Sequence, residues 1–202
     1  MEFHQAVRRR RMVRDFADRP VPMATLERVL ATALHAPSAG FTQGLELVVL
    51  DDSESVGAFF RLTDPWSRKH RDGSLPPVIV LPVADRDAYL RRYSEPDKQG
   101  LGLDVEEGWP IAYWELDAAM AVMLLLLAAV DEGLGSWFFG IFHGEQDVIR
   151  WLNIPAGCRP VGAVALGYAA AGATARGSAM TRPRRTLQDV VHRGGWSGSH
   201  GE

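Results

Sequence analysis

Four consecutive arginines occupy positions 8 to 11, and Arg14 follows three residues later. A guanidinium group binds phosphate through two parallel, charge-assisted hydrogen bonds. Several such groups on one short segment could therefore hold a phosphate monoester. The alternative is a solvated helix face with scattered surface arginines, and the run taken alone favours that alternative.

Two further segments carry residue types that suit a ligand site. In residues 36–43, small residues around Pro37 let backbone groups approach a ligand closely. In residues 132–142, glycines could expose backbone N–H groups beside a planar ring, and aromatic side chains could cover one. Taken singly, an ordinary turn explains the first segment better, and a helix end followed by a core strand explains the second equally well.

Considered together, the three segments resemble the FMN-dependent nitroreductase family in order and spacing. The arginine run ending at Phe16 is similar to that family's opening motif. Residues 37–43 resemble its Pro-Ser-Ser/Ala-x-Asn-x-Gln loop, and residues 133–136 resemble its Gly-Leu-Gly-Ser segment.

Two late segments extend this resemblance. Residues 161–168 resemble the family's last strand, and residues 182–191 resemble its closing Arg-x-x-Leu-x-x-Val-Val stretch. The similarity runs from about residue 7 to residue 192, and the stretch from 51 to 108 carries no motif that adds to it.

The resemblance implies a cofactor site without a catalytic side chain, because the flavin itself carries the chemistry. Arg10 and Arg11 would bind the phosphate and ribityl end of FMN, and Arg14 would lie nearer the pyrimidine edge. The loop from Ser38 would come from a partner subunit. The implied cofactor contacts are Arg10, Arg11, Met12, Arg14, Ser38, Ala39, Gly40, Phe41, Gln43, Phe139, Gly140, Ile141, Arg184 and Arg185.

Phe41, Tyr113 and Trp114 are the candidate substrate-pocket residues. For Tyr113 and Trp114, packing at a helix start is an equally good interpretation. The sequence departs from the family at Met12, where Ser is usual, and at Phe41, where Asn is usual. Gly44 and Leu45 replace a usual Pro-Trp pair. These departures concern the ring end of the flavin and leave the phosphate end as in the family.

The elements that must position these residues are expected as helices and strands that interleave. Apolar spacing and proline or glycine signals predict helices over 2–12, from Pro22 to Pro37, and over 53–62, 88–93, 110–132 and 145–152. Strands are expected at 45–50, 78–83, 136–142 and 161–168. The resemblance implies an α+β class: a three-layer α/β/α nitroreductase-like fold with a mainly antiparallel central sheet, in an intertwined homodimer.

Composition narrows the class of protein. The 202 residues suffice for one core, and we expect one domain over residues 1–193 with a flexible tail over 194–202. A single cysteine, Cys158, excludes an intrachain disulfide and fits a reducing cytoplasm. The start of the chain does not read as a secretory signal. The longest apolar run, 118–130, is expected to be too short for a bilayer, which needs ~20 residues.

The histidines show no metal-ligand spacing, so no metal is expected. The net charge is −3, with 22 basic against 25 acidic side chains. Clustered arginines on an acidic protein favour a small anion over a nucleic acid.

The resemblance thus implies an FMN-dependent enzyme, and the cysteine content and the start of the chain favour the cytoplasm. The enzyme would use NADH or NADPH to reduce nitroaromatics, quinones or similar electron-poor small molecules by ping-pong hydride transfer. Its partners would be a small-molecule substrate and a second copy of itself, without nucleic acid or membrane. Two alternatives stay open: a flavoenzyme of this fold that oxidises or dehydrogenates a small metabolite, and a protein that binds or sequesters flavin without turnover.

Overall fold

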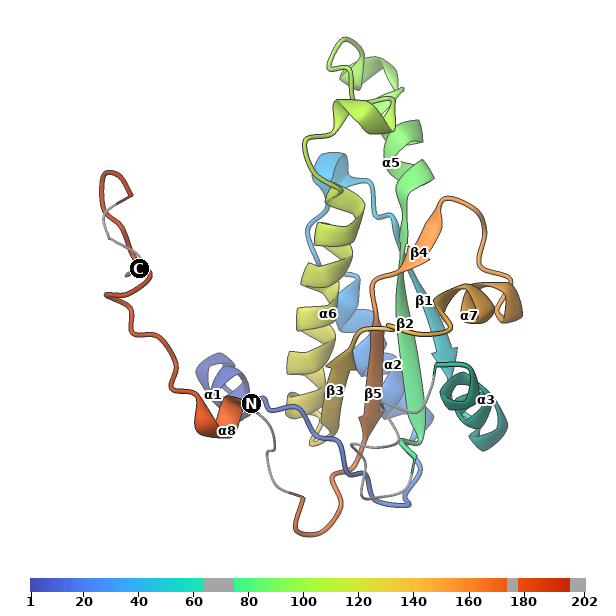
Figure 1. Ribbon diagram of the computed structural model, residues 1–202, viewed down its shortest axis with the longest axis vertical. Helices are drawn as coiled ribbons and strands as arrows, with labels where there is room; N and C mark the ends of the chain where they lie inside the picture. Colours follow the sequence, from blue (N-terminus) through green and yellow to red (C-terminus); the bar gives the residue numbers. More distant parts are fainter. Residues whose placement is uncertain (64–74, 174–177, 197–202) are drawn as a thin grey trace.

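The computed structural model describes residues 1–63, 75–173 and 178–196. Within that part of the chain, a five-stranded antiparallel sheet is covered by helices on both faces (Figure 1). The α+β class, the three layers and the antiparallel sheet predicted above are confirmed. The homodimer stays a prediction.

The sheet is built around one central strand, β2. Its order is β1-β2-β5-β3, and β4 also pairs with β2. Pro82 cannot donate a ladder hydrogen bond, and it lies where the neighbour of β2 changes from β5 to β4. The strands are β1 (Leu45–Leu50), β2 (Val78–Asp85), β3 (Gly135–Phe139), β4 (Cys158–Pro160) and β5 (Ala163–Gly167).

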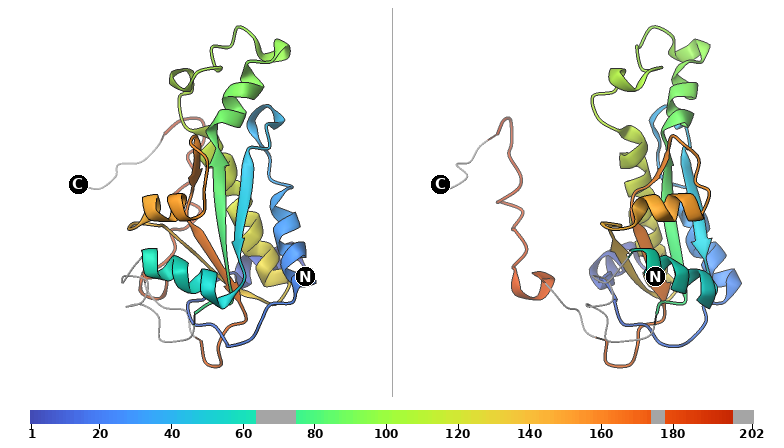
Figure 2. Two further views of the ribbon diagram at one scale, coloured as in Figure 1. Left: turned by 90° about the vertical axis from the view of Figure 1, so that its right-hand side faces the viewer. Right: turned by 45° about the vertical axis from the view of Figure 1, so that its right-hand side comes forward.

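Helices cover each face of this sheet (Figure 2). Helices α2 (Met23–Ala33) and α6 (Tyr113–Asp131) pack on one face, and α3 (Ser53–Thr63) and α7 (Glu145–Trp151) pack on the other. Short elements make up the rest: α1 (Phe3–Arg9), η1 (Ala39–Phe41), α5 (Arg86–Tyr93), η2 (Pro96–Lys98), η3 (Glu106–Gly108) and α8 (Ser178–Thr181).

Most predicted elements are confirmed, with small differences at their ends. The strand expected at 45–50 has those bounds. The long helix begins at Tyr113 rather than at Pro110, and Gly133 follows its end with φ +74°. A left-handed residue at this position terminates a helix, and glycine adopts it without strain. The three-residue strand β4 was not predicted.

Helix α6 divides into a buried face and an exposed apolar stripe. Its buried face contributes Ala121, Leu125 and Ala129 to the core against α2 and the sheet. On the opposite face, Leu116, Met120 and Met123 are 44%, 42% and 48% exposed. One face of α6 is therefore buried in the core, whereas the residues that the structure describes leave the opposite stripe partly exposed.

Helix α6 has 19 residues. It is therefore longer than the apolar run 118–130, which by itself is too short to cross a bilayer. Among the described residues, it is the one helix that could span a membrane by length and composition alone. Its packing against α2, β2 and β3 is that of a core helix.

An aromatic cluster supports the segment beyond α5. Tyr89 and Trp114 pack edge-on with Trp109, and the indole N–H of Trp109 donates to the Leu103 carbonyl at 2.8 Å. This cluster ties residues 103–114 to α5 and to the start of α6.

The core interpretation of α6 predicts the effect of one truncation. Leu125 is fully buried, so Leu125→Ala is expected to lower the free energy of unfolding by about 2–5 kcal/mol. Urea denaturation followed by circular dichroism measures this. The control Leu101→Ala removes the same atoms at a 57% exposed residue and should change stability by less than about 0.5 kcal/mol. Equal losses in the two variants would contradict the assignment.

Candidate functional site

The arginine-rich segment lies directly beside β3. The backbone N–H of Val13 donates to the Ser136 carbonyl at 2.8 Å, and Met12 forms a parallel bridge with Ser136. A Cβ at Gly135 would meet the Val13 side chain at 2.8 Å, so glycine is needed for this approach. The structure thus brings the first and third sequence motifs together.

Arg8, Arg9, Arg10 and Arg11 line an open cavity of about 660 Å³ together with residues 133–135, and we call this cavity the arginine pocket. Within the described part of the chain, Arg10 Nη1 is buried and has no hydrogen-bond partner. A buried, unpaired guanidinium nitrogen is costly, and an anion in the pocket would satisfy it.

The pocket also has an acidic rim. Asp131, near the end of α6, pairs with the N-terminal amine and raises the pKa of that amine. Because this carboxylate already has a cationic partner, it opposes an incoming anion less than a free carboxylate would.

Arg14 is not among the residues that line the arginine pocket, and it lies against Trp137 of β3. Its guanidinium carbon stands 5.4 Å from the centroid of the Trp137 ring, a cation–π distance. Trp137 stacks on Phe139 with ring centroids 4.3 Å apart. The structure therefore brings both Arg14 and Phe139 against one indole ring. Gly140 and Ile141 follow Phe139, where β3 ends.

Met12 has its side chain turned toward β3. Its sulfur accepts a hydrogen bond from the Phe138 backbone N–H at 3.5 Å, and its apolar atoms pack against both main core clusters. The residue does not line the arginine pocket. The Met12 side chain is therefore engaged within the protein, and the cofactor contact predicted for Met12 stays a prediction.

The loop of residues 38–43 lies at the opposite end of α6 (Figure 1). The Ala39 N–H donates to Asp117, at the start of the helix, whereas Asp131 at its end lines the arginine pocket. These two carboxylates are 14 residues apart in α6, which separates them by about 21 Å at 1.5 Å per residue. Within one chain, the structure does not bring the loop and the arginines together.

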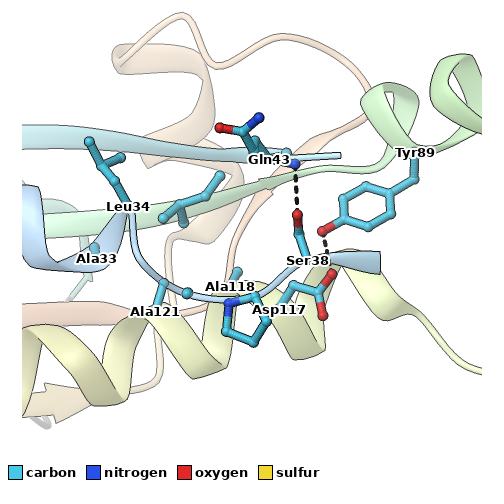
Figure 3. Close-up of a pocket in the computed structure, with 12 residues that line it drawn as sticks. Ala33, Leu34, Ser38, Gln43, Tyr89, Asp117, Ala118 and Ala121 are labelled. Carbon is cyan, nitrogen blue, oxygen red and sulfur yellow. Dashed lines mark hydrogen bonds between the residues drawn. The ribbon is translucent and has the colours of Figure 1, made fainter. Parts of the chain in front are cut away.

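The loop has an unusual backbone. Gly40, Phe41 and Gln43 have φ values of +62°, +53° and +56°. The Ser38 hydroxyl accepts from the Gln43 N–H at 2.9 Å, and Phe41 is 75% exposed. Figure 3 shows Ser38 and Gln43 beside a cavity of about 110 Å³, which Asp117, Tyr89, Leu34 and Ala118 also line.

Arg184 and Arg185 lie on a C-terminal arm that leaves the body of the protein (Figures 1 and 2). Both are exposed, and Arg185 donates to the Asp189 carbonyl on the arm itself. The structure does not place them at the arginine pocket of their own chain. Of the predicted tail 194–202, residues 197–202 lie outside the described residues.

Of the two aromatic candidates, Trp114 is 8% exposed within the aromatic cluster, and packing accounts for it. Tyr113 is half-buried and packs against that cluster. Two polar residues at the site were missed from the sequence, Tyr89 and Asp117. Asp117 had a signal that could have revealed it, because it is a carboxylate on the buried face of an otherwise apolar helix.

Fold and site together define a three-layer α+β protein with an arginine-lined pocket beside its edge strand β3. A sequence model described as the Nitroreductase family matches residues 7–168. The chain belongs to this family, and the prediction that it is an oxidoreductase of the nitroreductase type is confirmed.

Individual relatives are distant. An inferred NADH dehydrogenase/NAD(P)H nitroreductase from Methanothermobacter thermautotrophicus is 25% identical over 84% of this chain and 78% of its own length. An FMN reductase [NAD(P)H] from Bacillus subtilis is 24% identical over 79% of this chain and 63% of its length. The structure of an FMN-dependent nitroreductase from Clostridium difficile R20291 is 20% identical, covers 95% of this chain and 98% of that chain, and has a TM-score of 0.66.

The arginine pocket predicts a measurable response to inorganic phosphate. At a phosphate concentration ten times its dissociation constant, the melting temperature should rise by about 3–6 °C. Arg10→Gln should remove most of this rise, because Arg10 lines the pocket and its buried nitrogen has no partner among the described residues. Differential scanning fluorimetry against sodium chloride of equal ionic strength measures the effect. Arg61→Gln on α3 is the control, and an equal rise in wild type and Arg10→Gln would contradict the prediction.

Proposed function

We propose that the chain is an FMN-dependent oxidoreductase that takes electrons from NADH or NADPH and reduces nitroaromatics, quinones or similar electron-poor small molecules. The observation that carries the proposal is the arginine pocket, with its buried and unpaired Arg10 nitrogen beside β3. Family membership and relatives named FMN reductase or FMN-dependent nitroreductase support it.

The residues present fit the phosphate of FMN. Arg10 and Arg11 would hold it through charge-assisted hydrogen bonds, and the backbone at Gly135 allows close approach. Arg14, fixed over Trp137, would place a positive charge toward the pyrimidine edge of the ring. Bound FMN supplies hydride transfer in a ping-pong cycle, from the nicotinamide to the acceptor. The protein's own tasks are to anchor the phosphate, orient the ring and exclude water.

We further propose that two copies of the chain complete each site. A two-fold axis across the exposed stripe of Leu116, Met120 and Met123 would run two α6 helices antiparallel. The loop at the start of one helix would then lie beside the arginine pocket at the end of the other. The exposed C-terminal arm, with Arg184 and Arg185, would reach the partner in the same assembly.

One residue bears on the alternative of a flavoenzyme of the same fold that oxidises or dehydrogenates a small metabolite. Phe41 is 75% exposed in the loop that would meet the ring, where the family usually has an amide side chain. An aromatic surface there suits a flat metabolite that is oxidised.

One domain over residues 1–193 and a cytoplasmic location remain proposals as well.

The absorbance spectrum of the purified protein tests the cofactor. We expect the bands of oxidised flavin at about one FMN per chain, and oxidation of NADH or NADPH in the presence of menadione. A colourless protein that takes up no added FMN would refute the proposal. Bound flavin with no turnover from either donor would instead favour sequestration.

Complementation between two inactive variants tests the shared site. Arg10→Ala with Arg14→Ala removes the cationic side of the site. Gly40→Val removes the loop side, since its Cβ would meet the Tyr93 ring at 3.0 Å and valine does not accept a φ of +62°. Each variant alone is expected to lose FMN while circular dichroism shows a retained fold.

Co-expressed with different affinity tags, the two variants form a heterodimer with one site built from intact parts. That heterodimer should hold about half the FMN of wild type. If arginines and loop served one flavin within the same chain, the heterodimer would hold none.

A further inference from the structure

A buried carboxylate joins three elements at the loop end of α6. Asp117 is 7% exposed, and its Oδ2 accepts hydrogen bonds from the Ala39 N–H at 2.8 Å and from the Tyr89 hydroxyl at 2.6 Å. Figure 3 shows Tyr89 of α5 and Asp117 of α6 pointing toward each other beneath the loop. A charge at this depth is retained only where it is paired or hydrogen-bonded, and here both donors come from other elements.

The loop held by Asp117 is strained. Positive φ is costly for residues with a side chain, and both Phe41 and Gln43 adopt it. Such conformations persist only where the surroundings over-determine them, and they cluster at functional sites. Arg92 supplies a further restraint, because its Nε donates to the Gly40 carbonyl at 3.0 Å.

Tyr89 is suited to be a permanent donor. It is 1% exposed, and burial together with the Asp117 carboxylate raises the pKa of its phenol. The hydroxyl therefore stays protonated over the working pH range. Tyr93 packs on Gly40 one helix turn later, so α5 restrains the loop at two points.

We propose that Asp117 is a positioning residue, which fixes the loop of residues 38–43 in its ring-contacting conformation by binding the Ala39 N–H, with Tyr89 as its second donor. The inference rests on the proposed FMN function and on the shared site. Asp117 lies next to Leu116 of the exposed stripe. One turn of α6 thereby carries the proposed interface on one face and the residue that holds the loop on the other. In the proposed dimer, this turn fixes the position of the loop relative to the partner's arginine pocket.

The test uses three variants of the full-length protein. Asp117→Leu removes the acceptor and leaves both donors unpaired. Asp117→Asn keeps a carbonyl oxygen that can accept both hydrogen bonds. Tyr89→Phe removes one donor. Thr63→Val is the matched control, because it deletes a buried hydroxyl that donates to the Phe59 carbonyl within α3, away from the loop.

Hydrogen exchange of the FMN-free protein reads the loop directly. In Asp117→Leu, peptides covering residues 38–43 should exchange at least tenfold faster than in wild type, while peptides of β2 are unchanged. Asp117→Asn should stay within about threefold of wild type, and Tyr89→Phe should lie between the two. Thr63→Val should leave the loop unchanged.

Fluorescence titration with FMN gives the second measurement. The dissociation constant should rise at least tenfold in Asp117→Leu and less than threefold in Asp117→Asn. Faster exchange in β2 and the loop alike would mean that Asp117 only stabilises the fold, and would overturn the proposal. Unchanged loop exchange in Asp117→Leu would overturn it too. If wild type binds no FMN, the proposed function fails by itself, while the exchange data still report whether Asp117 holds the loop.

Discussion

The burial of one face of α6 is the constraint on which the rest of the structure depends. Leu125 and its neighbours fix this helix against the sheet as a rigid rod. Its start anchors the loop through Asp117, and its end borders the arginine pocket through Asp131. Asp117 and Asp131 are thereby held about 21 Å apart along the helix, at 1.5 Å per residue, so the loop and the arginine pocket cannot approach each other without disrupting the core. A site that needs both halves must draw on a second chain.

The distribution of charge favours a site for one small anion. The chain carries a net charge of −3, yet its four consecutive arginines gather beside the edge strand β3. Because the N-terminal segment is bonded to Ser136, the backbone and not only the side chains fixes where these cations lie. The pocket is local, and its unpaired Arg10 nitrogen suits one small anion better than an extended polyanion.

Helices and strands with one strong local signal can be predicted from the sequence. Features that depend on tertiary contacts cannot. The strand at 45–50 is flanked by turn residues, and its bounds were predicted correctly. The strand β4 has three residues and exists because β2 offers a free edge beyond Pro82, which no local pattern indicates. Family motifs predicted that the arginine segment and residues 132–142 belong together, and the structure brings these two segments side by side; they did not predict that the Met12 sulfur would accept from the Phe138 N–H. A carboxylate on the buried face of a helix marks Asp117 in the sequence, but its donors, Ala39 and Tyr89, are far from it in the chain, so its role becomes visible only in the structure.

The two departures from the family pattern have different structural consequences. Met12 replaces a hydroxyl with a thioether, and that thioether is engaged by the Phe138 N–H inside the protein. Its effect is therefore confined to the edge of the sheet. Phe41 stands exposed on a strained loop that Asp117 and Arg92 hold in place, so its ring is presented outward at a fixed position. A flavin ring bound to the partner subunit would contact an aromatic side chain at this loop, where the family usually has an amide. We therefore expect Phe41 to account for how this chain differs from its family in reaction or substrate. The Asp117 carboxylate beneath the loop fixes the position of Phe41.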